Sequence, residues 1–379
     1  MNISSEVQHK FMQYFNNELR LMKNCDHGNI LTEKFNPYHL EGDVWTHTTC
    51  AISHLPTIFN TFNISDDNIK KICSIAVMFH DVGKIYCRKF DPDKNKVMFY
   101  NHENYSVNFI INNNKKICDI FNISLDELIQ ICLIIQAHTI YYQINNPYDI
   151  FKYLNYDEQL LKMFTIVVNA DQLGRITIDV GNKPFINLDF YNTANFPIES
   201  VINYQDNKEI ILMVGCPASG KDAWADKLKN KNTLIISYDQ LRIETYLNFN
   251  KGISENTSSN QIYQYAFIYC QNKNIDITQK MIQYIKLNFI CNENINKIVI
   301  ANTNLSPKAR RPIVNLAKQY KIKISAITIL NDLDTLILRD KKRRNIDKSV
   351  GEFTIDSMFY SLQLPTKNEG FYDITYNFT

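Results

Sequence analysis

Residues 209–230 read EIILMVGCPASGKDAWADKLKN and decide the fold class of the second half of the chain. The apolar run at 209–215 is typical of a buried strand, and the charged stretch that ends this segment is typical of a helix. Between them, Gly215, Gly220 and Lys221 fit the pattern G-x-x-x-x-G-K. Such glycines let backbone N–H groups approach phosphate oxygens, while the helix start and the lysine add positive charge. The pattern therefore predicts a phosphate-binding loop, because an ordinary turn with an exposed lysine fits this strand-to-helix context less well.

Strand-like and helical segments continue to alternate after this loop. Runs rich in β-branched residues at 233–237, 297–302 and 323–330 each precede a helical pattern. Alternation of this kind indicates βαβ units. Residues 209–379 are therefore expected to form an α/β P-loop domain with a mostly parallel sheet.

The first half of the chain has a different pattern. Apolar residues recur there at helical spacing, as in 66–81, 124–137 and 157–172, and few β-branched runs are bounded by turns. Residues 1–185 are therefore expected to form an all-α domain. Residues 186–208 contain Asn and Pro with no clear period, and they are expected to form a linker or a peripheral segment.

Composition limits the class of protein. The 379 residues are 45% hydrophobic and 21% charged, which is ordinary for a folded chain. There is no run of about 18 apolar residues, so no membrane-spanning helix is expected. The nine scattered cysteines include no C-x-x-C pair, which favours reduced thiols and a cytoplasmic location. Residues 1–207 carry 17 basic and 23 acidic residues, whereas 208–379 carry 24 and 16. The positive second half could attract a polyanionic partner, but charge alone favours an ordinary solvated surface.

The phosphate-binding loop and the strand ends beside it supply the first set of candidate site residues. Asp222 stands where the motif usually has a Ser or Thr that binds Mg²⁺. A carboxylate can still bind the metal or its water shell, and it can also repel a triphosphate. Asp239 and Arg242 follow the strand-like run at 233–237, and parallel sheets place ligands at such strand ends. The candidates in this loop for binding a nucleoside triphosphate (ATP or another NTP) with Mg²⁺ are Gly215, Ala218, Ser219, Gly220, Lys221 and Asp222.

Residues 209–365, including the segment NTNLSPKARR at 302–311, resemble the phage-type polynucleotide 5′-kinase family. The resemblance implies that Asp239 is the catalytic base that takes the proton of a 5′-hydroxyl, and that Arg242 holds a neighbouring phosphate of the acceptor. The chemistry agrees, because phosphoryl transfer mainly needs cations on the migrating group and an aligned nucleophile. Considered singly, Asp239 is also a common type of N-cap.

The same resemblance assigns the remaining residues of this half. It implies that Lys221 and Arg343 act on the donor phosphates, with Arg339 one helical turn before Arg343. Asn302 and Asn304 are expected to contact nucleic acid, although the family often has Asp where this chain has Asn302. Considered singly, Arg343 is a common type of solvated charge.

Histidine and aspartate residues in the first half form the second set of candidates. His80 and Asp81 end an apolar helical stretch and begin HDVGK at 80–84, so the pair is expected to point into a pocket from a helix end. Imidazole and carboxylate together suit a divalent transition metal such as Mn, Fe, Co, Ni or Zn. Histidines 9, 27, 39 and 54 lack this context and are expected to have no role in the site. With His47 and Asp171, this pair has the spacing H…HD…D, and the candidate metal ligands are His47, His80, Asp81 and Asp171.

Residues 40–175 resemble the HD phosphohydrolase superfamily through WTH at 45–47, FHDVGK at 79–84 and NAD at 169–171. His102 and His138 fall where some members carry ligands of a second metal, although each alone also fits an ordinary histidine of a helix. The resemblance implies that Asp81 is a catalytic residue that bridges the two metals. Lys84 is expected to neutralise a substrate phosphate in catalysis.

An HD domain followed by a 5′-kinase domain resembles the bifunctional HD-domain polynucleotide kinases. The resemblance implies removal of 2′,3′-cyclic or 3′-phosphate ends by the first domain and phosphorylation of 5′-hydroxyl ends of RNA or DNA by the second. No ligase-like nucleotidyl lysine motif is evident, so a separate ligase is expected to act downstream. Two alternatives stay open. One is an HD nucleotide phosphohydrolase with a small-molecule P-loop kinase, and the other is a catalytically degraded, ATP-gated RNA-binding module, which Asp222 and Asn302 best support.

Overall fold

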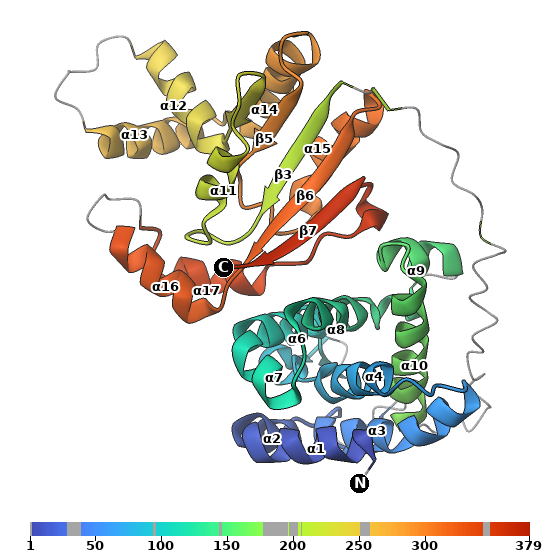
Figure 1. Cartoon of the computed structure of the whole chain (residues 1–379). Coiled ribbons are helices and arrows are strands. Elements are labelled where there is room, and N and C mark those ends of the chain that lie inside the picture. The colour runs from blue at the N-terminus through green and yellow to red at the C-terminus, as the bar shows by residue number, and fades with distance from the viewer. Residues whose placement is uncertain are drawn as a thin grey trace. The chain divides into compact units, whose positions relative to one another are not determined.

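The chain divides into two compact units, residues 1–198 and residues 199–379 (Figure 1). The predicted linker at 186–208 lies almost wholly outside the described residues, so the predicted domain boundaries stay predictions. The computed structural model describes residues 2–28, 39–93, 96–143, 146–176, 196, 204–205, 207–250, 258–343 and 349–379.

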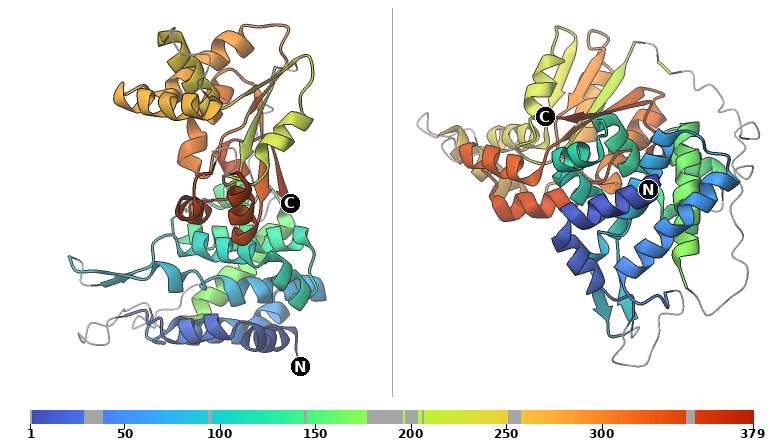
Figure 2. Two further views of the ribbon diagram at one scale, coloured as in Figure 1. Left: turned by 90° about the vertical axis from the view of Figure 1, so that its left-hand side faces the viewer. Right: turned by 60° about the horizontal axis from the view of Figure 1, so that its bottom comes forward.

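The first unit is helical, as expected, apart from a short antiparallel hairpin that extends from the helices (Figure 2). The hairpin joins β1 (Lys89–Asp91) to β2 (Lys96–Met98) and was not expected from the sequence. The helices are α1 (Ile3–Tyr14), α2 (Asn16–Lys23), α3 (Val44–Thr61), α4 (Asp67–Phe79), α5 (Lys84–Cys87), α6 (His102–Asn112), α7 (Asn114–Phe121), α8 (Leu125–Ala137), the 3₁₀ turn η2 (Ile140–Tyr142), α9 (Pro147–Tyr153) and α10 (Glu158–Gly174).

Local sequence explains the bounds and burial of α4, the helix that leads to the HD pair. Asp66 caps its start by accepting hydrogen bonds from the backbone N–H groups of Asn68 and Ile69. Every residue from Ile72 to Phe79 is buried, as expected for a helix that is apolar on all sides. The helices α3 and α10 pack against it and against each other.

The second unit is an α/β domain around a five-stranded sheet whose neighbouring strands are all parallel (Figure 1). The strand order is β4-β5-β3-β6-β7, which confirms the predicted fold class and adds the edge strand β7. The elements are β3 (Glu209–Val214), α11 (Lys221–Lys227), β4 (Thr233–Ile236), α12 (Tyr238–Phe249), α13 (Ser259–Asn272), α14 (Ile277–Ile285), the π-helical turn η5 (Lys286–Ile290), β5 (Lys297–Ile300), α15 (Pro307–Gln319), β6 (Lys323–Leu330), α16 (Leu333–Lys342), α17 (Glu352–Tyr360), η7 (Lys367–Glu369) and β7 (Asp373–Phe378).

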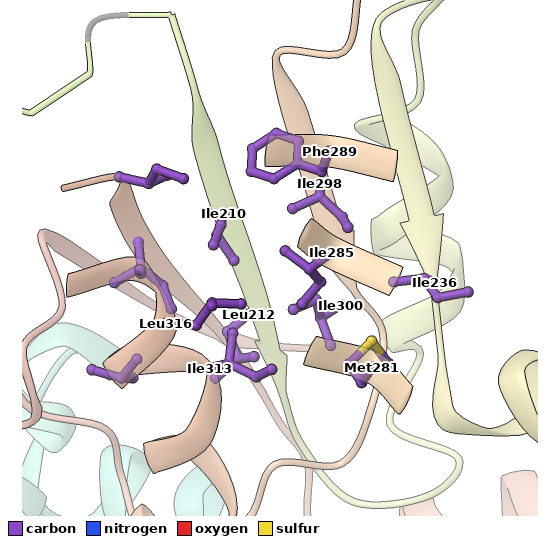
Figure 3. Packing of buried hydrophobic residues seen from close by; sticks show 14 of the residues in the cluster. Ile210, Leu212, Ile236, Met281, Ile285, Phe289, Ile298, Ile300, Ile313 and Leu316 are labelled. Carbon is purple, nitrogen blue, oxygen red and sulfur yellow. The ribbon is translucent and has the colours of Figure 1, made fainter. Parts of the chain in front are cut away.

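Alternating side chains cover the two faces of this sheet. Ile210 and Leu212 of β3 lie on the face covered by α14 and α15, where Ile285 and Ile313 pack against them (Figure 3). Ile211 and its same-face neighbours pack towards α11 on the other face. Burial on both faces explains why these strands read as continuous apolar runs in the sequence.

The topology collects the functional loops at one edge of the sheet. The chain leaves β3, β4 and β5 at the same edge because the three strands are parallel. The loop after β3 and the start of α12 are separated by β5, which is two strand spacings or about 10 Å. Among the described residues, none of the helices combines the length and hydrophobicity that crossing a membrane requires.

Candidate functional site

The loop after β3 has the backbone geometry that close approach to a ligand requires. A side chain at Gly215 would place its Cβ 2.8 Å from both the Ile329 carbonyl oxygen and Ser219 Oγ, so only glycine fits. Gly220 has a φ of 97°, in the left-handed region that favours glycine, and α11 begins at the next residue, Lys221. The loop therefore points a helix start and a lysine towards the same edge of the sheet.

The cations at this edge lie close to the loop. Lys221 is buried and donates to the Cys216 carbonyl oxygen at 2.6 Å. Burial lowers the pKa of its ammonium to about 8, and the positive charge of Arg343 adds to this effect. Arg339 donates to the Ser219 carbonyl oxygen at 3.3 Å, which brings α16 against the loop. Asp222 is exposed in the first turn of α11. Part of the predicted basic turn, Arg344, lies outside the described residues.

Asp239 and Arg242 form an ion pair in the first turn of α12. Arg242 Nη1 lies 2.6 Å from Asp239 Oδ1, and about half of the Asp239 side chain is exposed. Asp239 is not the N-cap of this helix. Ser237 is the N-cap and exchanges hydrogen bonds with Gln240, which leaves the Asp239 carboxylate available to solvent and ligands.

Exposed aromatic side chains lie on α12 and α13 beside this ion pair. The Arg242 guanidinium lies 5.3 Å from the ring centre of Phe267, and Tyr246 packs against Tyr265 and Tyr269. Phe267 is 39% exposed and Tyr265 is 47% exposed. An arginine next to exposed aromatic rings is a combination on which nucleobases can stack.

The two asparagines after β5 both bond to backbone groups. The Asn302 Oδ1 accepts a hydrogen bond of 2.8 Å from the backbone N–H of Tyr238, at the start of α12. Asn304 is buried, and its amide donates to the Met213 carbonyl oxygen at 2.8 Å. Asn302 thus links the start of α12 to the segment after β5, and Asn304 links the same segment to β3.

In the first unit, six predicted ligands converge on one buried cluster. The two carboxylate oxygens of Asp81 face different histidines: Oδ2 lies 3.5 Å from His47 Nε2 and 3.3 Å from His80 Nε2. Oδ1 lies 3.2 Å from His102 Nε2 and 4.0 Å from His138 Nε2. This geometry gives two adjacent positions for a cation that share the Asp81 carboxylate.

Asp171 completes the first of these positions. Its Oδ1 lies 3.0 Å from His47 Nε2 and 3.6 Å from His80 Nε2. Arg175, one helical turn later in the chain, donates to Asp171 Oδ2 at 2.7 Å. Lys84 Nζ lies 2.6 Å from Asp81 Oδ2, so a cationic side chain contacts each carboxylate.

The charges of this cluster suit a divalent cation. Although burial opposes the charged form of His80, Asp81 and Asp171 raise the pKa of its imidazole to about 10. Burial likewise opposes ionisation of Asp81 and Asp171, but His80 and Lys84 at Asp81, and Arg175 and His47 at Asp171, hold the two pKa values well below their usual range. His80 Nε2 is buried and makes no hydrogen bond with a described residue, yet it faces both carboxylates. A divalent cation between these atoms would satisfy the same charges.

Three further residues lie against the cluster. His27 and His39 stack with ring centres 4.2 Å apart, and Glu41 contacts His39 and His47. The expectation that His27 and His39 lie outside the site is therefore wrong. The available signal was spacing: His39 and Glu41 directly precede the helix that carries His47. Among the described residues, His9 and His54 belong to no such group.

A family model described as an AAA domain matches residues 210–365. Together with the parallel sheet and the G-x-x-x-x-G-K loop, this match makes the second unit a P-loop nucleoside triphosphatase domain of the kinase-like type. A domain of this type takes a nucleoside triphosphate with Mg²⁺, and phosphoryl transfer is the activity that it supports.

Proposed function

We propose that the chain heals both ends of a broken nucleic-acid strand, with RNA favoured over DNA. The second unit transfers the γ-phosphoryl group of an NTP to a 5′-hydroxyl end. The first unit, as an HD phosphohydrolase, removes a 2′,3′-cyclic or 3′-phosphate. The phosphohydrolase part of this proposal rests on the Asp81 carboxylate, whose two oxygens face two separate groups of histidines.

In the kinase reaction, the 5′-hydroxyl oxygen bonds to the γ-phosphorus while the bond from that phosphorus to the β–γ bridging oxygen breaks. The hydroxyl proton passes to the Asp239 carboxylate. Lys221 and Arg343 neutralise negative charge on the donor phosphates, and Mg²⁺ bound with the triphosphate adds further positive charge. Arg242 orients Asp239 through their 2.6 Å contact and offers its other N–H groups to an acceptor phosphate.

A polynucleotide acceptor is favoured over a small molecule by the surface around Arg242. The exposed rings of α12 and α13 offer stacking positions for more than one base. The positive balance of residues 208–379 also suits a polyanion. A small-molecule acceptor needs neither feature, so a series of acceptors from nucleoside to decanucleotide should show rising kcat/KM with length.

For the phosphoesterase reaction, His47, His80, Asp81 and Asp171 would hold one divalent metal, and Asp81, His102 and His138 would hold a second. Metal bound there would supply Lewis-acid polarisation of the phosphate ester and lower the pKa of a bound water, whose oxygen would add to phosphorus as the ester P–O bond breaks. Lys84 keeps the Asp81 carboxylate ionised and oriented at 2.6 Å, and its ammonium adds positive charge for the substrate phosphate.

The test uses an RNA with a 5′-hydroxyl and a 2′,3′-cyclic phosphate, incubated with NTP, Mg²⁺ and Mn²⁺, and reads both ends by mass. Asp239→Ala should abolish 5′-phosphorylation alone, and His80→Ala should abolish 3′-end hydrolysis alone. Loss of both activities in either variant would contradict independent sites. Binding of metal and NTP by wild type without turnover of either end would instead favour a degraded, ATP-gated RNA-binding module.

A further inference from the structure

A buried carboxylate lies behind His47, on the side away from the proposed metals. The Glu41 side chain is fully buried, and its Oε1 lies 3.0 Å from His47 Nδ1 and 2.6 Å from His39 Nδ1. Its Oε2 accepts a hydrogen bond of 2.9 Å from the backbone N–H of Ile176. Glu41 is therefore fixed by two hydrogen-bonded partners, His39 and the Ile176 backbone. It places a carboxylate oxygen beside His47 Nδ1, a buried nitrogen that has no hydrogen-bond partner among the described residues.

The other three histidines of the cluster are backed by neutral groups. The Nδ1 atoms of His80, His102 and His138 each face the carbonyl oxygen of the residue three positions earlier, at 2.7, 2.9 and 2.6 Å respectively. These contacts turn each Nε2 towards Asp81. Of the four histidines, His47 is therefore the one whose Nδ1 has a charged partner at this distance.

We propose that Glu41 is a positioning residue that holds His47 with Nε2 towards the metal and makes its imidazole a stronger ligand. A carboxylate behind a ligating histidine fixes the ring and raises its basicity, and such partners change metal affinity about 10–100-fold. This inference rests on the proposed metal centre. It predicts that Glu41 strengthens metal binding at the position formed by His47, His80 and Asp171. Metal binding at the position formed by His102 and His138 should not depend on Glu41.

A third cation held by His27, His39 and Glu41 is the competing interpretation, because ligand atoms of these residues all lie within 4.8 Å of one another. Two observations favour the positioning role. Lys84 Nζ lies 3.1 Å from His27 Nε2, and its positive charge opposes a cation there. Glu41 already accepts hydrogen bonds from His39 and the Ile176 backbone, and turning it towards a cation would remove its 3.0 Å contact with His47 Nδ1.

The experiment titrates Co²⁺ into metal-free full-length protein and follows the visible absorbance of the bound ion, with total cobalt measured after gel filtration. Glu41→Gln keeps the shape of the side chain and removes its charge. The matched control is Glu103→Gln, because Glu103 Oε2 lies 3.6 Å from His102 Nδ1, which already bonds to a backbone carbonyl. Wild type should bind two Co²⁺. In Glu41→Gln the Kd of one Co²⁺ binding step should rise about 10–100-fold. In Glu103→Gln the Kd values of both steps should stay within about twofold of wild type.

Each outcome decides between the interpretations. If wild type binds Co²⁺ and Glu41→Gln binds both ions equally well, the inference is wrong and the metal centre stands. If wild type binds no divalent metal, the proposed metal centre fails and the inference fails with it. Loss of one whole equivalent of Co²⁺ from a wild-type total of three would replace the inference with the third-cation site.

A second variant and a second readout distinguish a local effect on His47 from misfolding of the variant. His39→Asn leaves Glu41 and His47 in contact and should weaken the same binding step by a smaller factor. An effect on the other step would contradict the inference. In Zn²⁺-loaded protein, ¹⁵N NMR should show a His47 Nδ1–H signal that moves in Glu41→Gln and stays in place in Glu103→Gln.

Discussion

Raising the pH from 7 to 9 should weaken NTP binding through one side chain, Lys221. Burial lowers the pKa of its ammonium from 10.5 to about 8 in the protein without ligand, whereas triphosphate oxygens beside it would raise that pKa again. At pH 9, one unit above this value, about nine-tenths of the lysines are neutral before binding. Binding of the triphosphate must then be accompanied by uptake of a proton onto Lys221. The Kd should therefore rise about tenfold between pH 7 and 9, with uptake of about 0.9 proton per NTP at pH 9.

The assay is titration calorimetry with a non-hydrolysable ATP analogue and Mg²⁺ at pH 7 and pH 9. Two buffers of different ionisation enthalpy at each pH give the number of protons taken up. Lys221→Arg is the matched control, because a guanidinium stays charged throughout this range and should remove the proton uptake. Proton uptake near zero for wild type at pH 9, or equal uptake in Lys221→Arg, would refute the assignment of this linkage to Lys221.

Gly83→Ala should destabilise the first unit by at least about 1–3 kcal/mol in thermal unfolding, because a Cβ there would lie 2.0 Å from the His102 carbonyl oxygen. An unchanged melting temperature would show that the α5–α6 approach is not tight. Glu369→Gln should cost the second unit about 3–5 kcal/mol in denaturant unfolding, because it leaves the fully buried Arg310 guanidinium without its carboxylate partner at 2.7 Å. A cost below about 1 kcal/mol would contradict this, since exposed ion pairs have that value. Phe267→Ala should raise the KM for a single-stranded oligonucleotide about tenfold, from about 1–3 kcal/mol of stacking per base, with the KM for NTP unchanged. An equal rise in both KM values would indicate general damage to the domain.

The sheet of the second unit was predictable because its signal is local. The apolar runs that became β3 to β6 lie between turn or helix signals, and burial on both faces keeps each run continuous. The edge strand β7 was missed because none of the residues Asp373–Phe378 is buried, so the segment DITYNF lacks the continuous apolar run of the inner strands. The order of the strands in the sheet could likewise not be predicted from the sequence, since it depends on contacts between distant segments.

The convergence of the histidines with Asp81 and Asp171 was predictable from motif spacing, whereas the surroundings of this cluster were not. His80 and Asp81 are adjacent in sequence, so one helix end positions both of them. Arg175 and Glu41 lie within six residues of Asp171 and His47, but a lone arginine or glutamate in a sequence carries no signal of such a contact. The contacts of His47 with Asp171 and of Glu41 with the Ile176 backbone join segments more than 120 residues apart, so they become visible only when α3 and α10 are packed together.

Three of the six predicted ligands lie at helix ends, and this has a consequence for engineering. His80 and His138 directly follow α4 and α8, and His102 begins α6. The three imidazoles are therefore attached at helix ends and not in the central turns. Exchanging these imidazoles for carboxylates would move the preference towards harder ions such as Mg²⁺ or Mn²⁺. The apolar packing that folds the helices would be retained, which makes this unit a suitable scaffold for designed metalloenzymes.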